Sequence, residues 1–390
     1  MTAMAGKRIL IVAGEAAADR YGARLVRSLH DLHGGPAGFA FFGTGGDAMR
    51  AAGVNLRCHI RDLAHIGVRE ALSGLRTYYR TFRTLAGECK RQRPDVAILL
   101  DFPDFNLRLA KKLKRLGVPV VYYISPQIWA WRSGRIRLIR DYVDKMLVIL
   151  PFEEEYYRSR GVDAEFVGHP LLEDFAPRRD REGFLRGLGL NPSRKTVALL
   201  PGSRRKEIDY ILPALLGASL RLMAELPAQF LISAAPTVDR SRMERIMDSV
   251  LPRDLRNRFF RLVDHESRDI LANSDFAFVK SGTSSLEAAL VGNPFLITYK
   301  ISPLSWWIGS ALIRTPMKGL ANLIAGEKVV PELYQSAATP QALAKQAHDH
   351  LESAERCAAM CGRLATIRER LSVRCASASA AAVVSGYLKG

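Results

Sequence analysis

The chain has 390 residues, which is enough for two domains of ordinary size. Apolar side chains make up 48% of it, which excludes extended disorder, and no segment reaches the ~18 consecutive apolar residues of a membrane-spanning helix. The 57 basic and 39 acidic side chains give a net charge of +18, which favours an anionic partner such as nucleic acid, anionic lipid or a phosphorylated substrate. The N-terminus leads into a strand without a secretory signal pattern, so we expect a cytoplasmic protein.

Apolar runs alternate with segments of helical period along the first half of the chain. This alternation predicts a parallel sheet covered by helices on both faces, in a first domain over residues 1–172. Helices are predicted near 19–32 and 105–116. Strands are predicted at 7–13, 39–42, 95–100, 118–124 and 145–150.

The same alternation begins again after a polar stretch at 172–192, which predicts a linker and an opening helix. Strands are predicted at 196–200, 229–233, 277–280 and 295–299, and helices at 207–225 and 284–291. A second domain is placed at 173–365, and the helical tail at 366–390 is a candidate to pack back on the first domain. The fold class is therefore α/β, with two doubly wound Rossmann-like domains facing across a cleft, and ligands are expected at the carboxyl ends of their strands.

One turn in the second half is suited to binding an anion. Gly202, Ser203 and Arg204 join a predicted strand to a predicted helix. The N–H groups at such a helix start attract negative charge, and a guanidinium matches phosphate oxygens. The alternative is a plain strand–helix turn.

A second turn repeats this design with more hydroxyl groups. Ser281, Gly282, Thr283 and Ser284 follow the strand predicted at 277–280. Glu287 lies one turn further on and can accept hydrogen bonds from a ribose diol. The alternative is a capping box between Ser284 and Glu287, whose spacing fits that pattern. Two such turns at neighbouring strand ends favour a nucleotide site.

In the first half, Asp101 ends a buried strand. A carboxylate at the carboxyl end of a central strand faces the ligand site of such a sheet and can act as a general base. The alternative is a loop carboxylate bound by backbone N–H groups. Asp104 is better explained as a favourable charge at a helix N-terminus.

Other features of the first half concern sugar and lipid. Trp129 and Trp131 follow a strand end and can form a wall for a sugar ring, although core packing is the more usual role of tryptophan. The stretch at 66–85 has an apolar stripe beside an arginine stripe, which suits either a membrane interface or a core-facing helix. Its apolar residues are Val68, Leu72, Leu75, Tyr79 and Phe82, and its cations include Arg69, Arg76, Arg80 and Arg83.

Taken in order, these segments resemble the lipid-A-disaccharide synthase family over nearly the whole chain. Single pieces are generic, but their order and spacing are specific. In the first half they are VAGEAAAD (12–19), DLAHIGVREAL (62–72), DFPDFN (101–106), YISPQIWAWR (123–132), LPFEEEYY (150–157) and FVGHPL (166–171). In the second half they are LLPGSRRKEI (199–208), KSGTSSLEA (280–288) and NLIAGEKVVPEL (322–333).

The resemblance implies a glycosyltransferase B fold and an inverting transfer without metal or cofactor. The donor would be UDP-2,3-diacylglucosamine, the acceptor 2,3-diacylglucosamine-1-phosphate, and the new link β-1,6. Asp101 would deprotonate the acceptor 6-hydroxyl. The two turns would hold UDP with Asn322 nearby, and the acceptor would contact Glu15, Asp19, Gln127 and Trp129. The enzyme would attach to the anionic surface of the inner membrane on its cytoplasmic side and would not bind nucleic acid.

The absence of any Asp-x-Asp pair agrees with a metal-free reaction, since that pair is the usual metal–diphosphate ligand of other sugar transferases. Charge on the leaving diphosphate would then be stabilised by helix N-termini and Arg204.

One departure from the family pattern GEASGD lies in the first loop, where Ala17 and Ala18 replace serine and glycine. A hydroxyl is lost, and a position that tolerated positive φ carries a Cβ. We therefore expect altered binding in this loop and retained function, since Glu15 and Asp19 remain.

The alternatives to this function are another UDP-sugar enzyme of this fold, such as UDP-N-acetylglucosamine 2-epimerase, and a non-catalytic module that binds nucleic acid or membrane through its charge.

Overall fold

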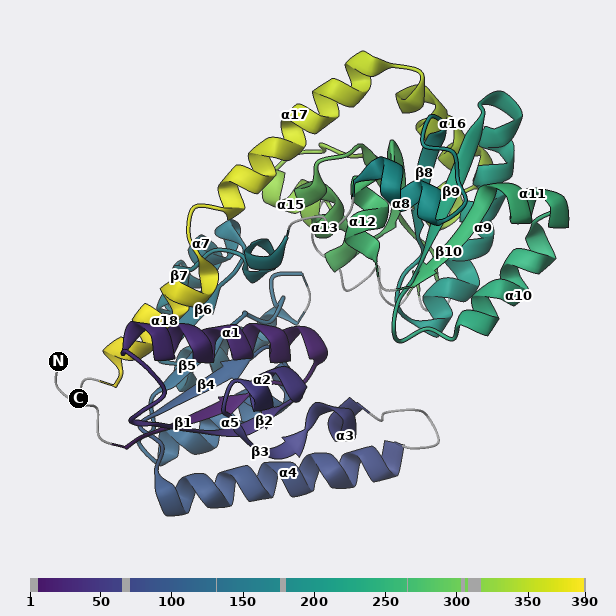
Figure 1. Ribbon diagram of the computed structural model, residues 1–390. Helices are drawn as coiled ribbons and strands as arrows, with labels where there is room; N and C mark the ends of the chain where they lie inside the picture. Colours follow the sequence, from purple (N-terminus) through teal and green to yellow (C-terminus); the bar gives the residue numbers. More distant parts are fainter. Residues whose placement is uncertain are drawn as a thin grey trace. The chain divides into compact units, whose positions relative to one another are not determined.

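The chain folds into two compact units, drawn in Figure 1 from a computed structural model. Unit 1 comprises Met1–Glu173 and Leu371–Gly390, and unit 2 comprises Asp174–Arg370. The structure describes residues 6–64, 71–130, 132–175, 180–264, 266–302, 306–307 and 317–388. No helix within these ranges is long and apolar enough to cross a bilayer. Trp131 and residues 66–70 of the predicted amphipathic stretch lie outside them.

Unit 1 contains a sheet of seven parallel strands in the order β3-β2-β1-β4-β5-β6-β7. The strands are β1 Lys7–Val12, β2 Phe39–Gly45, β3 Asn55–His59, β4 Val96–Leu100, β5 Val120–Tyr123, β6 Lys145–Val148 and β7 Ala164–Phe166. The sequence analysis does not predict β3 or β7, because these edge strands (NLRCH and AEF) lack an apolar run. The other five strands confirm the prediction of a buried parallel sheet.

Helices cover both faces of this sheet, and alternate residues of β1 belong to two separate cores. Ile9 and Ile11 pack in the core that includes residues of α1 and α18, whereas Leu10 and Val12 pack in the core that includes residues of α4 and α5. The helices are α1 Ala16–Leu32, α2 Asp47–Ala51, α3 Ile60–Ala64, α4 Ala71–Gln92, α5 Pro103–Arg115, α6 Ile136–Tyr142, α7 Pro151–Arg158 and α18 Ala376–Gly386.

The C-terminal segment completes unit 1 by packing against residues far away in the sequence. The helix α18 lies along α1 (Figure 1). The backbone N–H of Ser377 donates to Glu173 Oε1 at 2.6 Å, and Arg374 Nη1 donates to Glu165 Oε1 at 3.0 Å. Gly168 has a left-handed φ of 94°, and a Cβ there would lie 2.2 Å from the carbonyl oxygen of Arg374. Only a glycine therefore lets this segment approach so closely.

Unit 2 contains six parallel strands in the order β10-β9-β8-β11-β12-β13. They are β8 Lys195–Leu200, β9 Ala228–Ala234, β10 Phe260–Asp264, β11 Phe276–Lys280, β12 Phe295–Tyr299 and β13 Glu332–Tyr334. The edge strands β10 and β13 are again the ones that the sequence analysis does not predict. The helices are α8 Arg181–Gly187, α9 Arg205–Glu225, α10 Arg240–Val250, α11 Arg253–Phe259, α12 Ser267–Ala272, α13 Thr283–Val291, α15 Leu320–Ala325, α16 Pro340–Leu351 and α17 Ala354–Leu371.

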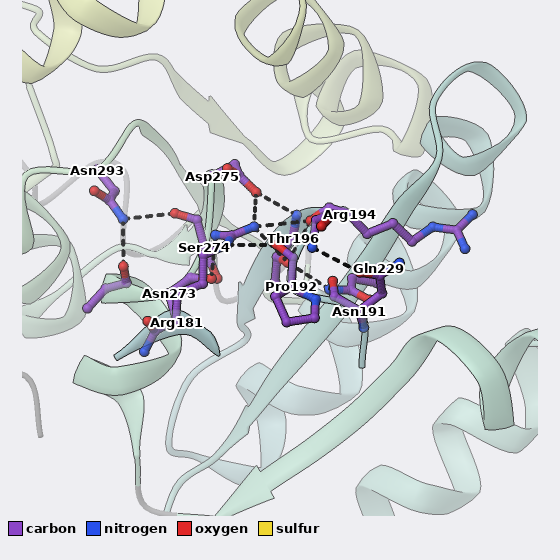
Figure 2. A network of polar contacts seen from close by, with 12 residues as sticks. Arg181, Asn191, Pro192, Arg194, Thr196, Gln229, Asn273, Ser274, Asp275 and Asn293 are labelled. Carbon is purple, nitrogen blue, oxygen red and sulfur yellow. Dashed lines mark hydrogen bonds and ion pairs between the residues drawn. The ribbon is translucent and has the colours of Figure 1, made fainter. Parts of the chain in front are cut away.

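A polar network closes the amino-terminal edge of the unit 2 sheet (Figure 2). Arg181 donates to Asp275 Oδ2 at 2.9 Å and to the carbonyl oxygens of Pro192 and Asn273 at 3.1 and 3.0 Å. Asp275 Oδ2 also accepts the backbone N–H of Thr196 at 2.7 Å. The network ties α8 to the starts of β8 and β11, at the edge opposite to the one where such sheets bind ligands.

In each sheet the strand order reverses once, between β1 and β4 in unit 1 and between β8 and β11 in unit 2. At such a point the connections leave on opposite faces of the sheet and open a crevice beyond the carboxyl ends of the two strands. We therefore expect ligands to bind at the loops after β1, β4, β8 and β11.

The close approach at Gly168 can be tested with Gly168→Ala. We expect the free energy of unfolding to fall by about 3 kcal/mol or more, because a left-handed alanine costs ~1–2 kcal/mol and its Cβ overlaps the Arg374 carbonyl. Gly161→Ala is the matched control, with φ 75° and only the flexible Arg140 side chain nearby, and should cost about 1 kcal/mol. Equal losses in urea unfolding of the two variants would contradict the role given to this contact.

Candidate active site

Asp101 and Glu15 lie at the point in unit 1 where the strand order reverses. Glu15 is exposed and precedes α1, in the loop after β1, and Asp101 directly follows β4. Burial, together with the nearby charge of Glu15 and against the lowering effect of the Phe102 backbone N–H, raises the pKa of Asp101 to about 6. A carboxyl group with such a pKa is ionised near neutral pH and still accepts a proton readily, as a general base must.

The backbone at Asp101 is strained and is held by two buried side chains. Asp101 and Phe102 both adopt left-handed conformations, with φ of 44° and 46°. The Asp101 carbonyl oxygen accepts hydrogen bonds from Asn106 Nδ2 at 2.8 Å and from the Tyr122 hydroxyl at 2.5 Å. A Cβ at Gly14 would lie 2.3 Å from the Phe102 ring, so the loop after β1 needs glycine there. Such strain is typical of positions where geometry serves function.

Asp19 is buried and holds a neighbouring loop. Its carboxylate accepts the backbone N–H groups of Gly46, Ala48 and Met49 at 2.6, 3.1 and 3.0 Å. These bonds fix the start of α2 after β2. A direct contact between Asp19 and a substrate stays a prediction, and the bonds seen here give this residue a structural role in the same loop cluster.

The structure places Ala17 and Ala18, which replace serine and glycine of the family pattern, in a helix. Both residues lie in the first turn of α1, and neither has a positive φ. Ala18 is buried in the core beneath α1, and Ala17 packs partly against it. A Cβ is therefore accommodated at both positions, because the chain is already helical there.

The loop after β5 carries Gln127 and Trp129. Gln127 is exposed, whereas Trp129 is half-buried and donates its indole N–H to Glu153 Oε1 at 2.9 Å. Ser125 Oγ donates to the same oxygen at 2.8 Å. Glu153 lies in the first turn of α7 and is buried, and burial raises its pKa to about 7 against the lowering effect of these donors. The sequence analysis does not identify Glu153.

In unit 2, the first anion-binding turn follows β8. Gly202 has φ 118°, and Arg204 directly precedes α9 with a side chain that is 78% exposed and makes no capping hydrogen bond. The Ser203 N–H donates to Glu207 Oε2 at 3.2 Å. The turn therefore presents an exposed guanidinium at a helix N-terminus, and the buried Glu207 carboxylate, whose Oε1 lies 3.7 Å from Arg204 Nη1, holds the backbone of the turn.

The second turn follows β11, the strand next to β8. It contains Ser281, Gly282, Thr283 and Ser284. Its helix α13 begins after Gly282, which has φ 139°, and no side chain caps it. The alternative capping box is therefore wrong, because Ser284 already lies inside the helix. The Glu287 carboxylate instead accepts a hydrogen bond from Ser267 Oγ at 3.3 Å.

A buried ion pair joins these two turns. Lys280 Nζ lies 3.1 Å from Glu207 Oε1, and Glu207 is 2% exposed. Lys280 Nζ also lies 3.0 Å from the place of a Cβ at Gly282. The sequence analysis does not identify either member of the pair, although Lys280 ends an otherwise apolar strand, which is an available signal.

Asn322 does not lie free beside these turns. Its Nδ2 donates to the Val330 carbonyl at 2.9 Å and to Glu332 Oε1 at 2.7 Å. Its Oδ1 accepts the backbone N–H groups of Val329 and Val330 at 2.8 and 2.9 Å. Glu332 Oε2 accepts the N–H of Lys318, whose carbonyl accepts Ser281 Oγ. Asn322 is thus linked to the second turn through Glu332 and Lys318.

The structure brings together Gly202–Arg204 with Ser281–Gly282 in unit 2, and Glu15 with Asp101 in unit 1. Asp19 and Trp129 are engaged in structural hydrogen bonds at the same edge of the unit 1 sheet. In the part of the chain that the structure describes, no group of three or more His, Cys, Asp or Glu side chains is placed to hold a metal ion.

Two doubly wound units of this kind place the chain among proteins of the glycosyltransferase B fold. A solved structure of UDP-GlcNAc 2-epimerase from Neisseria meningitidis bound to UDP-GlcNAc has a TM-score of 0.64 at 13% identity, covering 98% of this chain and 100% of that one. The calicheamicin glycosyltransferase CalG4 has a TM-score of 0.60 at 16% identity, covering 98% of both chains. At such identities these likenesses show the fold alone.

The family follows from the sequence. A family model described as lipid-A-disaccharide synthetase matches residues 9–384. The lipid-A-disaccharide synthase of Koribacter versatilis is 42% identical over 365 residues, which cover 93% of each chain. This chain belongs to the lipid-A-disaccharide synthase family and is a glycosyltransferase of lipid A biosynthesis. The resemblance found in the sequence is confirmed, and the epimerase and the non-catalytic binding module are set aside.

The ion pair beneath the two turns can be tested with Lys280→Met. We expect a loss of about 3 kcal/mol in the free energy of unfolding, because the variant removes the closer charged partner of the buried Glu207 carboxylate and leaves only the exposed Arg204, 3.7 Å away. The double variant Lys280→Met with Glu207→Leu should recover much of this loss in urea unfolding. Arg205→Met removes an exposed cation next to the turn and should change stability by less than about 0.5 kcal/mol. Additive losses in the double variant would contradict a coupled pair.

Proposed function

We propose that the chain transfers 2,3-diacylglucosamine from UDP-2,3-diacylglucosamine to 2,3-diacylglucosamine-1-phosphate. The 6-hydroxyl oxygen of the acceptor attacks C1 of the donor while its proton passes to the Asp101 carboxylate. The C1–O bond to the diphosphate breaks, UDP leaves, and the β-1,6 disaccharide forms with inversion at C1. The observation that carries this proposal is the strained, half-buried position of Asp101 at the order reversal of unit 1, with its pKa raised to about 6.

Unit 2 would hold the UDP part of the donor. The helix starts after Gly202–Arg204 and Ser281–Thr283 offer backbone N–H groups to the diphosphate, and exposed Arg204 adds a guanidinium. Glu287, half-buried one turn into α13, would accept hydrogen bonds from the ribose. Asn322 would act as a positioning residue, because its amide is already fully bonded. Since the sequence has no Asp-x-Asp pair, we assign the stabilisation of leaving UDP to these groups and not to a metal.

Unit 1 would hold the acceptor. Glu15 and Gln127 are exposed in the loops after β1 and β5, and the half-buried Trp129 ring can pack on a sugar. Asp19 would act through the loop that it fixes at Gly46.

The base can be tested with Asp101→Asn. We expect kcat to fall by about 10²–10⁴-fold, because the amide cannot take the proton. Asp104→Asn is the matched control: Asp104 is exposed, pairs with Arg132 and Arg135, and should be dispensable for the proton transfer. In the wild type, kcat/KM should fall about tenfold per pH unit below pH ~6, because protonation of Asp101 removes the base. Disaccharide synthesis by Asp101→Asn at the wild-type rate would remove Asp101 as the base.

We further propose that unit 1 attaches to the anionic cytoplasmic surface of the inner membrane through a basic face. We define this face as Arg76, Arg80 and Arg83 of α4 with Arg108, Lys112 and Arg115 of α5. Each trio follows helical spacing, all six side chains are exposed, and none forms an ion pair with another described residue. The helices α4 and α5 pack together on one core, and Tyr79 is 50% exposed between the arginines of α4.

Three arginines of unit 2, unlike those of the basic face, form ion pairs with carboxylates that the structure describes. The exposed Arg240 and Arg245 of α10 pair with Asp264 and Asp239, and the half-buried Arg256 of α11 pairs with Asp248. The uncompensated charge of the basic face would attract anionic lipid, and an exposed tyrosine suits a membrane interface.

Membrane attachment can be tested by co-sedimentation with vesicles that contain an anionic phospholipid. The triple variant Arg76→Gln, Arg80→Gln, Arg83→Gln should reduce vesicle binding by about tenfold or more, since each cation near such a surface contributes about 1 kcal/mol. The control triple variant Arg240→Gln, Arg245→Gln, Arg256→Gln removes the same charge from unit 2 and should bind nearly as the wild type does. Equal binding by the two triple variants would contradict a basic face on unit 1.

A further inference from the structure

We infer that Glu153 is a positioning residue for the acceptor: it fixes the loop that carries Gln127 and Trp129. This inference rests on the proposed acceptor role of that loop. Glu153 belongs to α7, which follows β6, whereas the loop follows β5. The helix α7, which lies outside the acceptor loop in the sequence, therefore holds that loop.

The Glu153 carboxylate joins three parts of unit 1. Its Oε1 accepts Ser125 Oγ at 2.8 Å and the Trp129 indole N–H at 2.9 Å. Its Oε2 accepts the backbone N–H of Leu150 at 3.2 Å. The end of β5, the acceptor loop and the turn before α7 thus share one buried side chain.

Helix capping alone does not account for this arrangement. A glutamate in a first helical turn ordinarily stays in water and bonds the N–H groups of its own helix start, as Glu153 Oε2 does with Leu150. Here the side chain is 1% exposed, and its other oxygen is engaged entirely by the loop. Burial of a carboxylate costs several kcal/mol unless donors offset it, so the loop's two donors and the carboxylate depend on one another.

The same helix anchors the loop at a second place. The Tyr157 hydroxyl donates to the Pro126 carbonyl at 2.8 Å, and Ile124 at the start of the loop has a left-handed φ of 68°. The Trp129 ring packs edge-on against Phe152, with ring centroids 4.9 Å apart. Between these anchors Gln127 is left exposed. Its position is therefore set by α7.

Loss of the carboxylate should weaken acceptor binding and leave donor binding unchanged. Without Glu153, the indole N–H of Trp129 and the Ser125 hydroxyl lose their shared acceptor, and the indole plane is no longer fixed. The donor turns lie in unit 2, have their own buried anchors at Glu207 and Lys280, and share no hydrogen bond with Glu153 among the described residues.

The experiment compares the KM of each substrate, and the affinity for the acceptor by calorimetric titration in detergent, for the full-length chain. Glu153→Gln should raise the acceptor KM and dissociation constant about tenfold and leave the donor KM within twofold. Trp129→Phe keeps an aromatic six-membered ring but removes the pyrrole part of the indole with its N–H, and it should give a smaller rise in the same two constants. Glu154→Gln is the control, since Glu154 pairs with Arg158 on the surface of the same helix turn, and it should behave as the wild type.

The double variant Glu153→Gln with Trp129→Phe decides whether one residue acts through the other. If it does, the double variant should bind the acceptor no more weakly than Glu153→Gln alone. Additive losses, an unchanged acceptor KM in the single variants, or equal rises in both KM values would overturn the inference. If Glu153→Gln fails to fold, Trp129→Phe and Ser125→Ala each still report the acceptor-specific rise or its absence.

Failure of the proposed function would look different. A wild type that makes no disaccharide but binds the acceptor would refute the reaction, and the titrations of the variants would still decide the role of Glu153. A wild type that neither turns over nor binds the acceptor would remove both proposals.

Discussion

Buried carboxylates that accept backbone N–H bonds hold the loops on which the active site depends. Asp19, Glu153 and Glu207 are each less than 10% exposed, and each bonds main-chain N–H groups of a loop beyond a strand end. A parallel sheet leaves such loops without ladder partners, and a desolvated anion bonds N–H groups more strongly than a neutral oxygen does. In a chain with a net charge of +18, the acids are thus used inside as anchors while the uncompensated cations remain at the surface.

Asp101 differs from these three anchors, because its carboxylate does not hold a loop. Its carbonyl oxygen, and not its carboxylate, is held by Asn106 and Tyr122. No hydrogen bond from a described side chain reaches its carboxylate, which keeps a raised pKa through burial and the charge of Glu15. A base needs a proton affinity that strong donors would remove. The fold meets this need by fixing the main chain at two left-handed residues and leaving the carboxylate without side-chain donors.

The sequence predicts the central strands well, because buried parallel strands are continuous apolar runs, and it places the two Gly-containing turns directly after such strands. It does not predict the edge strands β3, β7, β10 and β13, which need no such run. Glu153 and Glu207 escape detection for another reason. Each lies in a first helical turn, where glutamate is ordinary, and its burial depends on partners such as Trp129 and Lys280 that lie 24 or more residues away. A sequence pattern does not show that one surface of a helix is covered by a distant part of the chain.

Under the proposed function, α5 connects the chemistry to the membrane. The helix begins at Pro103, directly after Asp101 and Phe102, and it carries Arg108, Lys112 and Arg115 on its exposed side. At 1.5 Å per residue, Arg108 lies only about 8 Å along the axis from the helix start. A phosphorylated glycolipid has its reacting hydroxyl within one sugar ring of its acyl chains, so an active site that acts on it must lie close to the lipid surface. A single short helix that begins beside the base and carries a cation about 8 Å further along its axis satisfies that requirement.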